Sequence, residues 1–503
     1  MRKKLLAVSI SFILAGCGGG SSDSPNISIS QAFIPLPVTA QNQPEVDLFS
    51  NGVTKFPDLK PYMASMCGTQ TNIQSFFLAD VNKDGRKDVV MSFWCRSETG
   101  VLTYGPTKNK VLIFTQQTDG TFVESTKAIL GRDAVDLNGV GHNHVVYDFN
   151  KDGYDDFVFV VSREDARLPS PDGATNHHAY NMFFTSKGDG TYDISPMGIY
   201  AWNYGIKLID NSSGGKDIIT MPIGYTKLVE HFSFVNGKWV ISDQYSWING
   251  TDPIVFSGKE AKHAVTSMAY PDLGVSLYNK TSSGSWVLAS SEKFGEYKMV
   301  PFVTWQLMQK LTQLYTIDGK QYINMATANI CELKSPTQSS AIVAVSGNEF
   351  TKPYVEGTTV EEGASYLKTV SKLLSYKNSG KLEKSNNFYI KGENIDASIH
   401  KMNCIDVNND GYDDVTVHDW RAKTEPIIYV NNKNGTMSRV DPSKIPGKNL
   451  FASSQTYIYE DVNNDGIRDL IYWPIAGFGS QDNLALKVYY GNRQIKDSDL
   501  IQN

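Results

Sequence analysis

Four short stretches of this chain repeat one pattern of oxygen-bearing side chains that could bind a metal ion. Each has Asp at positions 1, 5 and 9, Asn at position 3 and Gly at position 6. Ca²⁺ prefers roughly six to eight oxygen ligands, and a loop with this spacing can wrap such a hard cation. Position 7 would contribute only its backbone carbonyl, so its side chain can vary. The predicted ligands are Asp80, Asn82, Asp84, Arg86 and Asp88; Asp148, Asn150, Asp152, Tyr154 and Asp156; Asp406, Asn408, Asp410, Tyr412 and Asp414; and Asp461, Asn463, Asp465, Ile467 and Asp469.

These stretches differ from EF-hands, which need a bidentate Glu at position 12 and a helix on each side. Position 12 is apolar in all four, and the flanking runs, such as Phe157–Val161, are rich in β-branched and aromatic residues. Such runs are typical of strands joined by a tight turn. We therefore predict about four Ca²⁺ sites in β-hairpin loops. Their role would be structural, because a cation enclosed by loop oxygens has no open position for a substrate.

The N-terminus has the features of a targeting segment. Basic residues 2–4 precede an apolar stretch, Leu5–Leu14, which is too short to span a bilayer. The following Leu14-Ala15-Gly16-Cys17 resembles the lipobox of bacterial lipoproteins. That resemblance implies a signal peptide over 1–16 and a lipid-modified Cys17, and Gly18 in place of Asp favours the outer membrane. Residues 17–45 are rich in Gly, Ser, Pro and Gln, as in a flexible tether. The membrane would be contacted through the lipid anchor only, and the membrane face stays open.

Charge and cysteine content fit an extracytoplasmic protein. Of 47 Lys and Arg, three precede the lipobox, which leaves 44 against 53 Asp and Glu, a net charge of −9. No basic run or stripe indicates nucleic acid as a partner. Besides Cys17 there are four cysteines, an even number that permits disulfides in an oxidising compartment. One pairing is within a unit, Cys67 with Cys95, and the other would join neighbouring units, Cys331 with Cys404. Four buried free thiols remain the alternative.

Internal repeats predict the fold class. Seven Gly-containing turns followed by an aromatic or apolar residue recur along the chain, as at Asn236-Gly237 with Trp239. Counting the metal loops in parallel also gives seven units, if three weaker ones occupy the middle: a decayed loop over 210–217, a hairpin near 268–277 and a segment near 324–330. Seven units of four strands each predict an all-β, seven-bladed β-propeller.

The pattern Asp-x-Asn-x-Asp-Gly-x-x-Asp between strands, followed by a Gly-containing hairpin, resembles the FG-GAP or VCBS repeat family. The best-known fold of that family is the seven-bladed propeller of integrin alpha subunits. The resemblance covers about residues 46–500 and implies calcium at the four loops, but little about activity. The propeller would span 46–503, and its last blade would be completed by an N-terminal strand, Val46–Phe56. We expect a helical insert at about 355–395, centred on Glu361–Lys377, and a second helical stretch over Phe302–Leu314.

Histidines form the other candidate site. His142 and His144 alternate along the strand that enters the second loop, and His177 and His178 begin a later strand of the same unit. Converging imidazoles could bind a transition metal or act as acid and base, or they could be ordinary hydrogen-bonded side chains.

The sequence contains no Gly-x-Ser-x-Gly elbow, Walker loop or His-Glu-x-x-His motif. The favoured function is a non-catalytic recognition scaffold that binds a protein or glycan. The alternative is a polysaccharide-active lyase or hydrolase with its site near blade two.

Overall fold

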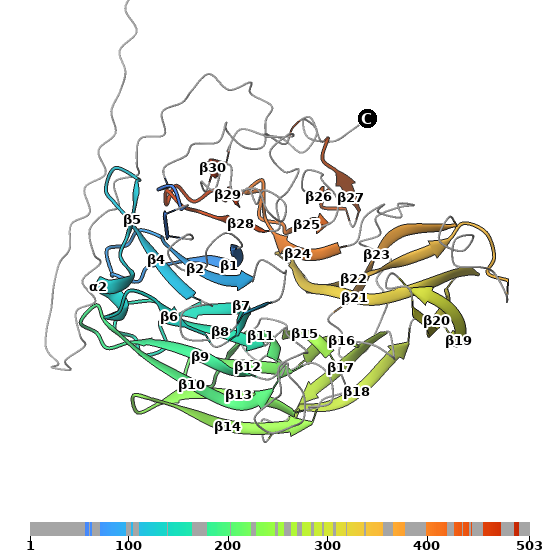
Figure 1. Ribbon diagram of the computed structural model, residues 1–503, viewed down its shortest axis with the longest axis horizontal. Coiled ribbons are helices and arrows are strands. Elements are labelled where there is room, and N and C mark those ends of the chain that lie inside the picture. The colour runs from blue at the N-terminus through green and yellow to red at the C-terminus, as the bar shows by residue number, and fades with distance from the viewer. Residues whose placement is uncertain are drawn as a thin grey trace, which may run out of the picture. The chain divides into compact units, whose positions relative to one another are not determined.

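The structure is a computed structural model (Figure 1). Antiparallel strands make up almost all of the regular secondary structure among its described residues. The described residues fall within the unit 35–503. They are 56–59, 61–62, 71–96, 102–103, 110–137, 139–162, 179–201, 203–222, 228–246, 250–255, 263–268, 274–282, 286–293, 296–304, 308–317, 319–336, 339–355, 366–377, 399–419, 427–434, 436–441, 444, 456–473 and 487–491.

These residues form seven sheets, numbered here in chain order. The first contains β1 (Thr71–Ala79), β2 (Asp88–Arg96), β3 (Leu102–Thr103), β4 (Lys110–Gln116), β5 (Phe122–Glu124) and β6 (Val135–Asp136), with helix α2 (Thr126–Leu130) after β5. The second contains β7 (Val140–Tyr147), β8 (Asp156–Ser162), β9 (Ala179–Ser186) and β10 (Tyr192–Ala201). The third contains β11 (Asn203–Asp210), β12 (Lys216–Pro222), β13 (Leu228–Val235) and β14 (Lys238–Ser246).

Each of the remaining four sheets is also built from strands that are consecutive in the chain. The fourth contains β15 (Gly250–Val255), β16 (His263–Met268), β17 (Gly274–Lys280) and β18 (Trp286–Lys293). The fifth contains β19 (Glu296–Thr304), β20 (Met308–Ile317), β21 (Lys320–Lys334), β22 (Ser339–Phe350) and β23 (Leu367–Lys377). The sixth contains β24 (Ile399–Ile405), β25 (Asp414–Asp419), β26 (Ile427–Asn431) and β27 (Met437–Arg439), and the seventh contains β28 (Thr456–Glu460), β29 (Asp469–Trp473) and β30 (Lys487–Tyr489).

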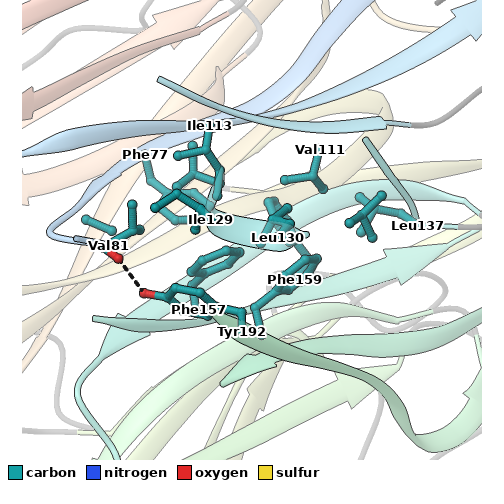
Figure 2. Packing of buried hydrophobic residues seen from close by; sticks show 14 of the residues in the cluster. Phe77, Val81, Val111, Ile113, Ile129, Leu130, Leu137, Phe157, Phe159 and Tyr192 are labelled. Carbon is teal, nitrogen blue, oxygen red and sulfur yellow. Dashed lines mark hydrogen bonds between the residues drawn. The ribbon is translucent and has the colours of Figure 1, made fainter. Parts of the chain in front are cut away.

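The hydrophobic core lies mainly between sheets that are consecutive in the chain. Figure 2 shows one cluster, in which Phe77 and Ile113 of the first sheet and Ile129 of α2 meet Phe157 and Tyr192 of the second. Similar clusters join the second sheet to the third and the fifth to the sixth. Since burial of a large apolar side chain contributes roughly 1.5–3 kcal/mol, these clusters stabilise the packing of consecutive sheets against each other.

The first and last sheets also share a cluster. Phe76 and Phe114 of the first sheet pack in one group with Ile471 and Val488 of the seventh. Phe56 belongs to the same group, and its ring centroid lies 4.6 Å from that of Phe114. The predicted closing strand, residues 46–56, otherwise lies outside the described residues.

Both predicted helical stretches are wrong where the structure describes them. Residues 367–377 form strand β23, which pairs with β22 from Leu367 opposite Phe350 to Lys377 opposite Ser340. Residues 302–304 and 308–314 belong to β19 and β20, which pair antiparallel. The apolar spacing matched a helical period, but pairing with a long neighbouring strand and complete burial of Tyr376 outweigh that preference. The predicted unit at 324–330 likewise lies inside strand β21.

The hairpin prediction holds at Asn236-Gly237, where both residues have positive φ angles, 50° and 74°, as a two-residue turn of this kind requires. Within the described residues, no helix is long and apolar enough to cross a membrane.

Candidate metal centres

The four predicted loops occupy equivalent places in four sheets. Each joins the first strand of its sheet to the second: β1 to β2, β7 to β8, β24 to β25 and β28 to β29. In every loop the residue at position 4 has a left-handed backbone, with φ of 56–61° at Lys83, Lys151, Asn409 and Asn464. The glycine at position 6 also has a positive φ, 77° at Gly85. These two left-handed residues bend the backbone of the loop, so that its side-chain oxygens lie close to the amides of the same loop.

The Asp at position 1 accepts hydrogen bonds from the backbone of its own loop. In the first loop, the Asp80 carboxylate accepts from the amides of Asp84 at 3.1 Å and Gly85 at 2.8 Å. The other three loops repeat this pair of bonds. The Asp84 amide also lies 3.1 Å from the side-chain oxygen of Asn82. One amide therefore brings the oxygens of positions 1 and 3 close together.

The Asp at position 5 holds the turn that follows it. Asp84 accepts from the Arg86 amide at 2.9 Å, and the equivalent bond is present in the other loops. Its second oxygen accepts from the position-3 Asn side chain in all four loops and has a further partner in three. That partner is the Arg86 guanidinium in the first, the Ser186 hydroxyl at 2.8 Å in the second and the Lys433 ammonium at 3.1 Å in the third.

The Asp at position 9 is completely buried and connects three segments of backbone. In the second loop, Asp156 accepts from the amide of Phe149 at 2.9 Å and from that of Ser186, on the third strand, at 2.7 Å. Equivalent bonds are made by Asp88, Asp414 and Asp469.

Burial, and to a smaller extent the charges of the position-1 and position-5 carboxylates, raise the pKa of Asp88, Asp156 and Asp469 to about 7, although backbone hydrogen bonds oppose this rise. Burial also raises the pKa of Asp414 well above its usual value. These carboxylates thus lie close enough to repel one another. A divalent cation among them would remove that repulsion.

The donor set fits a hard cation. Each loop contributes three carboxylates, one amide oxygen and one backbone carbonyl, which are the oxygen ligands that Ca²⁺ prefers. Within the described part of the chain, no three His, Cys, Asp or Glu side chains form a ready-made metal cage. The loop carboxylates accept hydrogen bonds from backbone amides. A carboxylate oxygen can still accept a second partner, so these bonds do not exclude a cation.

In the third sheet, a shorter turn between β11 and β12 stands in the place of the predicted metal loop and neutralises its own carboxylates. The Lys216 ammonium forms an ion pair with Asp210. Asp217, in the place of the position-9 residue, accepts bonds of 2.9 Å each from Asn211, His231 and Ser233. Burial opposes ionisation of Asp217, but these hydrogen bonds outweigh it and hold its pKa below the usual range. These partners already balance the charge of both carboxylates of this turn. In the fifth sheet, the turn between β21 and β22, 335–338, contains no Asp or Glu.

The histidines have separate partners. His142 Nε2 lies 2.6 Å from the hydroxyl of buried Ser162 in its own sheet. His144 Nδ1 lies 3.0 Å from the Ser75 hydroxyl of the first sheet, and its ring stacks on Phe77 at 4.1 Å. A β-bulge after Gly141 breaks the alternation on which the predicted convergence depended. His177 and His178 lie outside the described residues.

A disulfide joins Cys331 of β21 to Cys404 of β24, and so links the fifth sheet to the sixth. Cys17 and Cys67 lie outside the described residues, as does the side chain of Cys95.

Sequence reasoning missed the residue at position 8. Asp155 and Asp413 occupy that position in the second and third loops, and each bonds to the preceding sheet. The Asp155 carboxylate accepts from the Asp80 amide at 2.7 Å, and the Asp413 carboxylate accepts from the Lys334 amide at 2.7 Å. The signal was available, since Asp recurs at position 8 in two loops.

One comparison with known proteins concerns the loops directly. Residues 406–472, which include the third and fourth loops, match the FG-GAP-like repeat family. The resemblance seen in the sequence is confirmed for this segment. No match was found among curated proteins.

Solved structures resemble the chain only distantly. The exotype rhamnogalacturonan lyase YesX has 12% identity and a TM-score of 0.43, with 84% of this chain and 72% of that one covered. An alpha-L-arabinanase of Penicillium chrysogenum has 9% identity and a TM-score of 0.41, covering 90% and 98%. The periplasmic gluconolactonase of Pseudomonas aeruginosa has 8% identity and a TM-score of 0.41, covering 78% and 95%. Likeness at this level carries no inference about activity.

Proposed function

We propose that this chain is a calcium-stabilised, seven-bladed β-propeller that recognises a protein or glycan from a lipid anchor on the outer membrane. One observation carries the calcium proposal. Four loops repeat the same oxygen donor set, and each ends in a fully buried Asp bonded to backbone amides of the loop and of a third strand. A cation at such a loop would stabilise the whole sheet, because the Asp belongs both to the loop and to the sheet interior.

Contacts between the first and last sheets support the proposal of a closed ring. The Asn464 side chain of the fourth loop donates to the Gly85 carbonyl of the first at 3.1 Å. Strand β28 also contacts β1, and the two sheets share a hydrophobic cluster. In the proposed ring the seven sheets are the blades, and residues 46–56 supply the strand that the three-stranded last sheet lacks.

The proposed anchor is Cys17, which would be lipidated after removal of residues 1–16. Its support is the resemblance of Leu14-Ala15-Gly16-Cys17 to a lipobox. The disulfide between Cys331 and Cys404 suits the same compartment, because disulfides persist in oxidising surroundings. Mass spectrometry of the intact chain tests the anchor. A diacyl or triacyl mass on Cys17 supports it, and an unmodified or absent Cys17 contradicts it.

The surroundings of His142 argue against one candidate catalytic pair. Its imidazole is close enough to the Ser162 hydroxyl to act as a base, at 2.6 Å, but Ser162 is completely buried. A nucleophile must reach its substrate, so this pair is better suited to joining two strands than to attacking a glycosidic or ester bond. The alternative, a polysaccharide-active enzyme with a site near the second sheet, predicts turnover that is lost in His142→Ala without a change in melting temperature.

A crosslinking pull-down from intact cells, with and without EDTA, tests the recognition proposal. A defined protein partner that is lost with EDTA supports a calcium-dependent scaffold. The same chain should then be screened against a panel of polysaccharides. Release of sugar fragments would contradict the non-catalytic proposal, and binding without fragments would identify a glycan ligand.

A further inference from the structure

The first two metal loops are connected by a set of hydrogen bonds centred on Asp155. The Asp155 amide donates to the Asp80 carbonyl at 2.9 Å, and the Asp80 amide donates back to the Asp155 carboxylate at 2.7 Å. Asp80 is the first predicted ligand of the first loop. Asp155 stands between Tyr154 and Asp156, two predicted ligands of the second loop. The backbone of one candidate site is therefore fixed directly to that of the other.

Two more side chains reinforce this connection. The hydroxyl of buried Tyr192 lies 3.3 Å from the Val81 carbonyl (Figure 2) and 2.7 Å from the Asp155 carbonyl, so it touches both loops. The Lys83 ammonium of the first loop donates to the Asp152 carbonyl of the second at 2.5 Å and lies 5.4 Å above the Tyr154 ring. We call the contacts of Lys83, Asp155 and Tyr192 the loop clasp.

The third loop has the same anchoring bonds without a second metal loop to reach. The Asp413 amide donates to the Lys334 carbonyl at 2.9 Å, and the Lys334 amide donates back at 2.7 Å. Lys334 ends β21, and the turn after it contains no carboxylate. The third loop is therefore a matched internal control. It makes the same two bonds to the preceding sheet, but the turn that it reaches carries no carboxylate ligands for a cation.

From this difference we propose that the first and second loops bind calcium cooperatively, with Asp155 and Tyr192 as the positioning residues that couple them. The inference rests on the proposed calcium function and adds a coupling to it. Ordering one loop around a cation fixes residues 154–156 or residues 80–84, and the clasp transmits that order to the other loop. The second ion then binds a site that is already arranged, which is the physical basis of positive cooperativity. Coupling of about fivefold or more in affinity is expected, the lower end of typical values.

Calcium titration calorimetry of the full chain, stripped of metal, tests the coupling. Asp152→Ala disables the second loop and should also weaken binding at the first by about fivefold. Asp410→Ala disables the third loop at the equivalent position and should eliminate only its own site. If both variants lose a single site and leave the others unchanged, the coupling is wrong. If the unaltered chain binds no calcium, the proposed function is wrong and the coupling is overturned with it.

A second pair of variants assigns the coupling to the clasp. Tyr192→Phe and Asp155→Ala should retain calcium binding at both loops but make it non-cooperative, so that adding Asp152→Ala weakens the first loop no further. Asp413→Ala removes the equivalent carboxylate beside the third loop and should leave the cooperativity of the first two unchanged. Equal loss of cooperativity in Asp155→Ala and Asp413→Ala would overturn the assignment. So would full cooperativity in both Tyr192→Phe and Asp155→Ala.

Discussion

Removal of the disulfide between the fifth and sixth sheets should destabilise the protein by about 4 kcal/mol. The bond joins Cys331 to Cys404, which are 73 residues apart in sequence. In the chain-entropy treatment, a crosslink that closes a loop of this length lowers the entropy of the unfolded chain by about 15 cal/mol/K, or about 4 kcal/mol at 25 °C. The expected loss of stability therefore comes from the higher entropy of the unfolded chain without the crosslink, and it requires no change in the folded structure.

Urea denaturation followed by tryptophan fluorescence measures this loss. The double variant Cys331→Ala, Cys404→Ala should unfold at lower urea than the wild type under non-reducing conditions. Dithiothreitol should shift the wild type further than the variant by a similar amount, because in the variant only the predicted pair of Cys67 with Cys95 could still be reduced. A remaining difference between the reduced wild type and the variant measures lost side-chain packing, since both cysteines pack against a core cluster of the fifth and sixth sheets. A shift of less than about 1 kcal/mol on reduction would refute the entropic reasoning.

Three further substitutions have defined outcomes. Asp465→Ala should eliminate one calcium site and about 2.7 kcal/mol of stability at calcium a hundredfold above its dissociation constant, measured as a smaller response of thermal melting to EDTA. Asp217→Ala should cost about 2–4 kcal/mol near pH 7, because it removes the hydrogen bond from His231 at 2.9 Å and two others. Since the pKa of Asp217 is held low, this stabilisation is present above pH of about 4 and is lost as the pH falls further, so melting curves of variant and wild type should converge in acid. Gly198→Ala should cost about 2 kcal/mol or more, because its φ is +89° and a Cβ would lie 2.5 Å from the Glu230 carboxylate. Retention of the wild-type melting temperature by this variant would contradict that geometry.

The sequence was most informative where structure is local. The loop spacing and the turn at Asn236-Gly237 each depend on a few neighbouring residues, whose backbone preferences act without the rest of the fold. The strand at 367–377 was not predictable in this way, because its partner and the burial of Tyr376 are tertiary features. An apolar spacing that fits a helix can also fit a strand packed on one face.

The same distinction between local and tertiary features applies to the candidate site. The shared geometry of the four loops could be predicted because each loop is a run of nine consecutive residues, whereas calcium binding by them stays a prediction. Tyr192 could not, since it follows Asp155 by 37 residues and reaches it only when β10 packs beside the loops. The separate partners of His142 and His144 were not predictable for a related reason. Strict alternation would direct His142 and His144 to one side, and a single bulge after Gly141 sends them to different partners.

The most direct test of the central proposal is the calcium content of the purified chain. After equilibration in millimolar calcium and removal of unbound metal, inductively coupled plasma mass spectrometry should find about four Ca²⁺ per chain, one for each loop with the repeated donor set. Each of the variants Asp84→Ala, Asp152→Ala, Asp410→Ala and Asp465→Ala should lower that number. A chain that binds no calcium under these conditions would contradict the account.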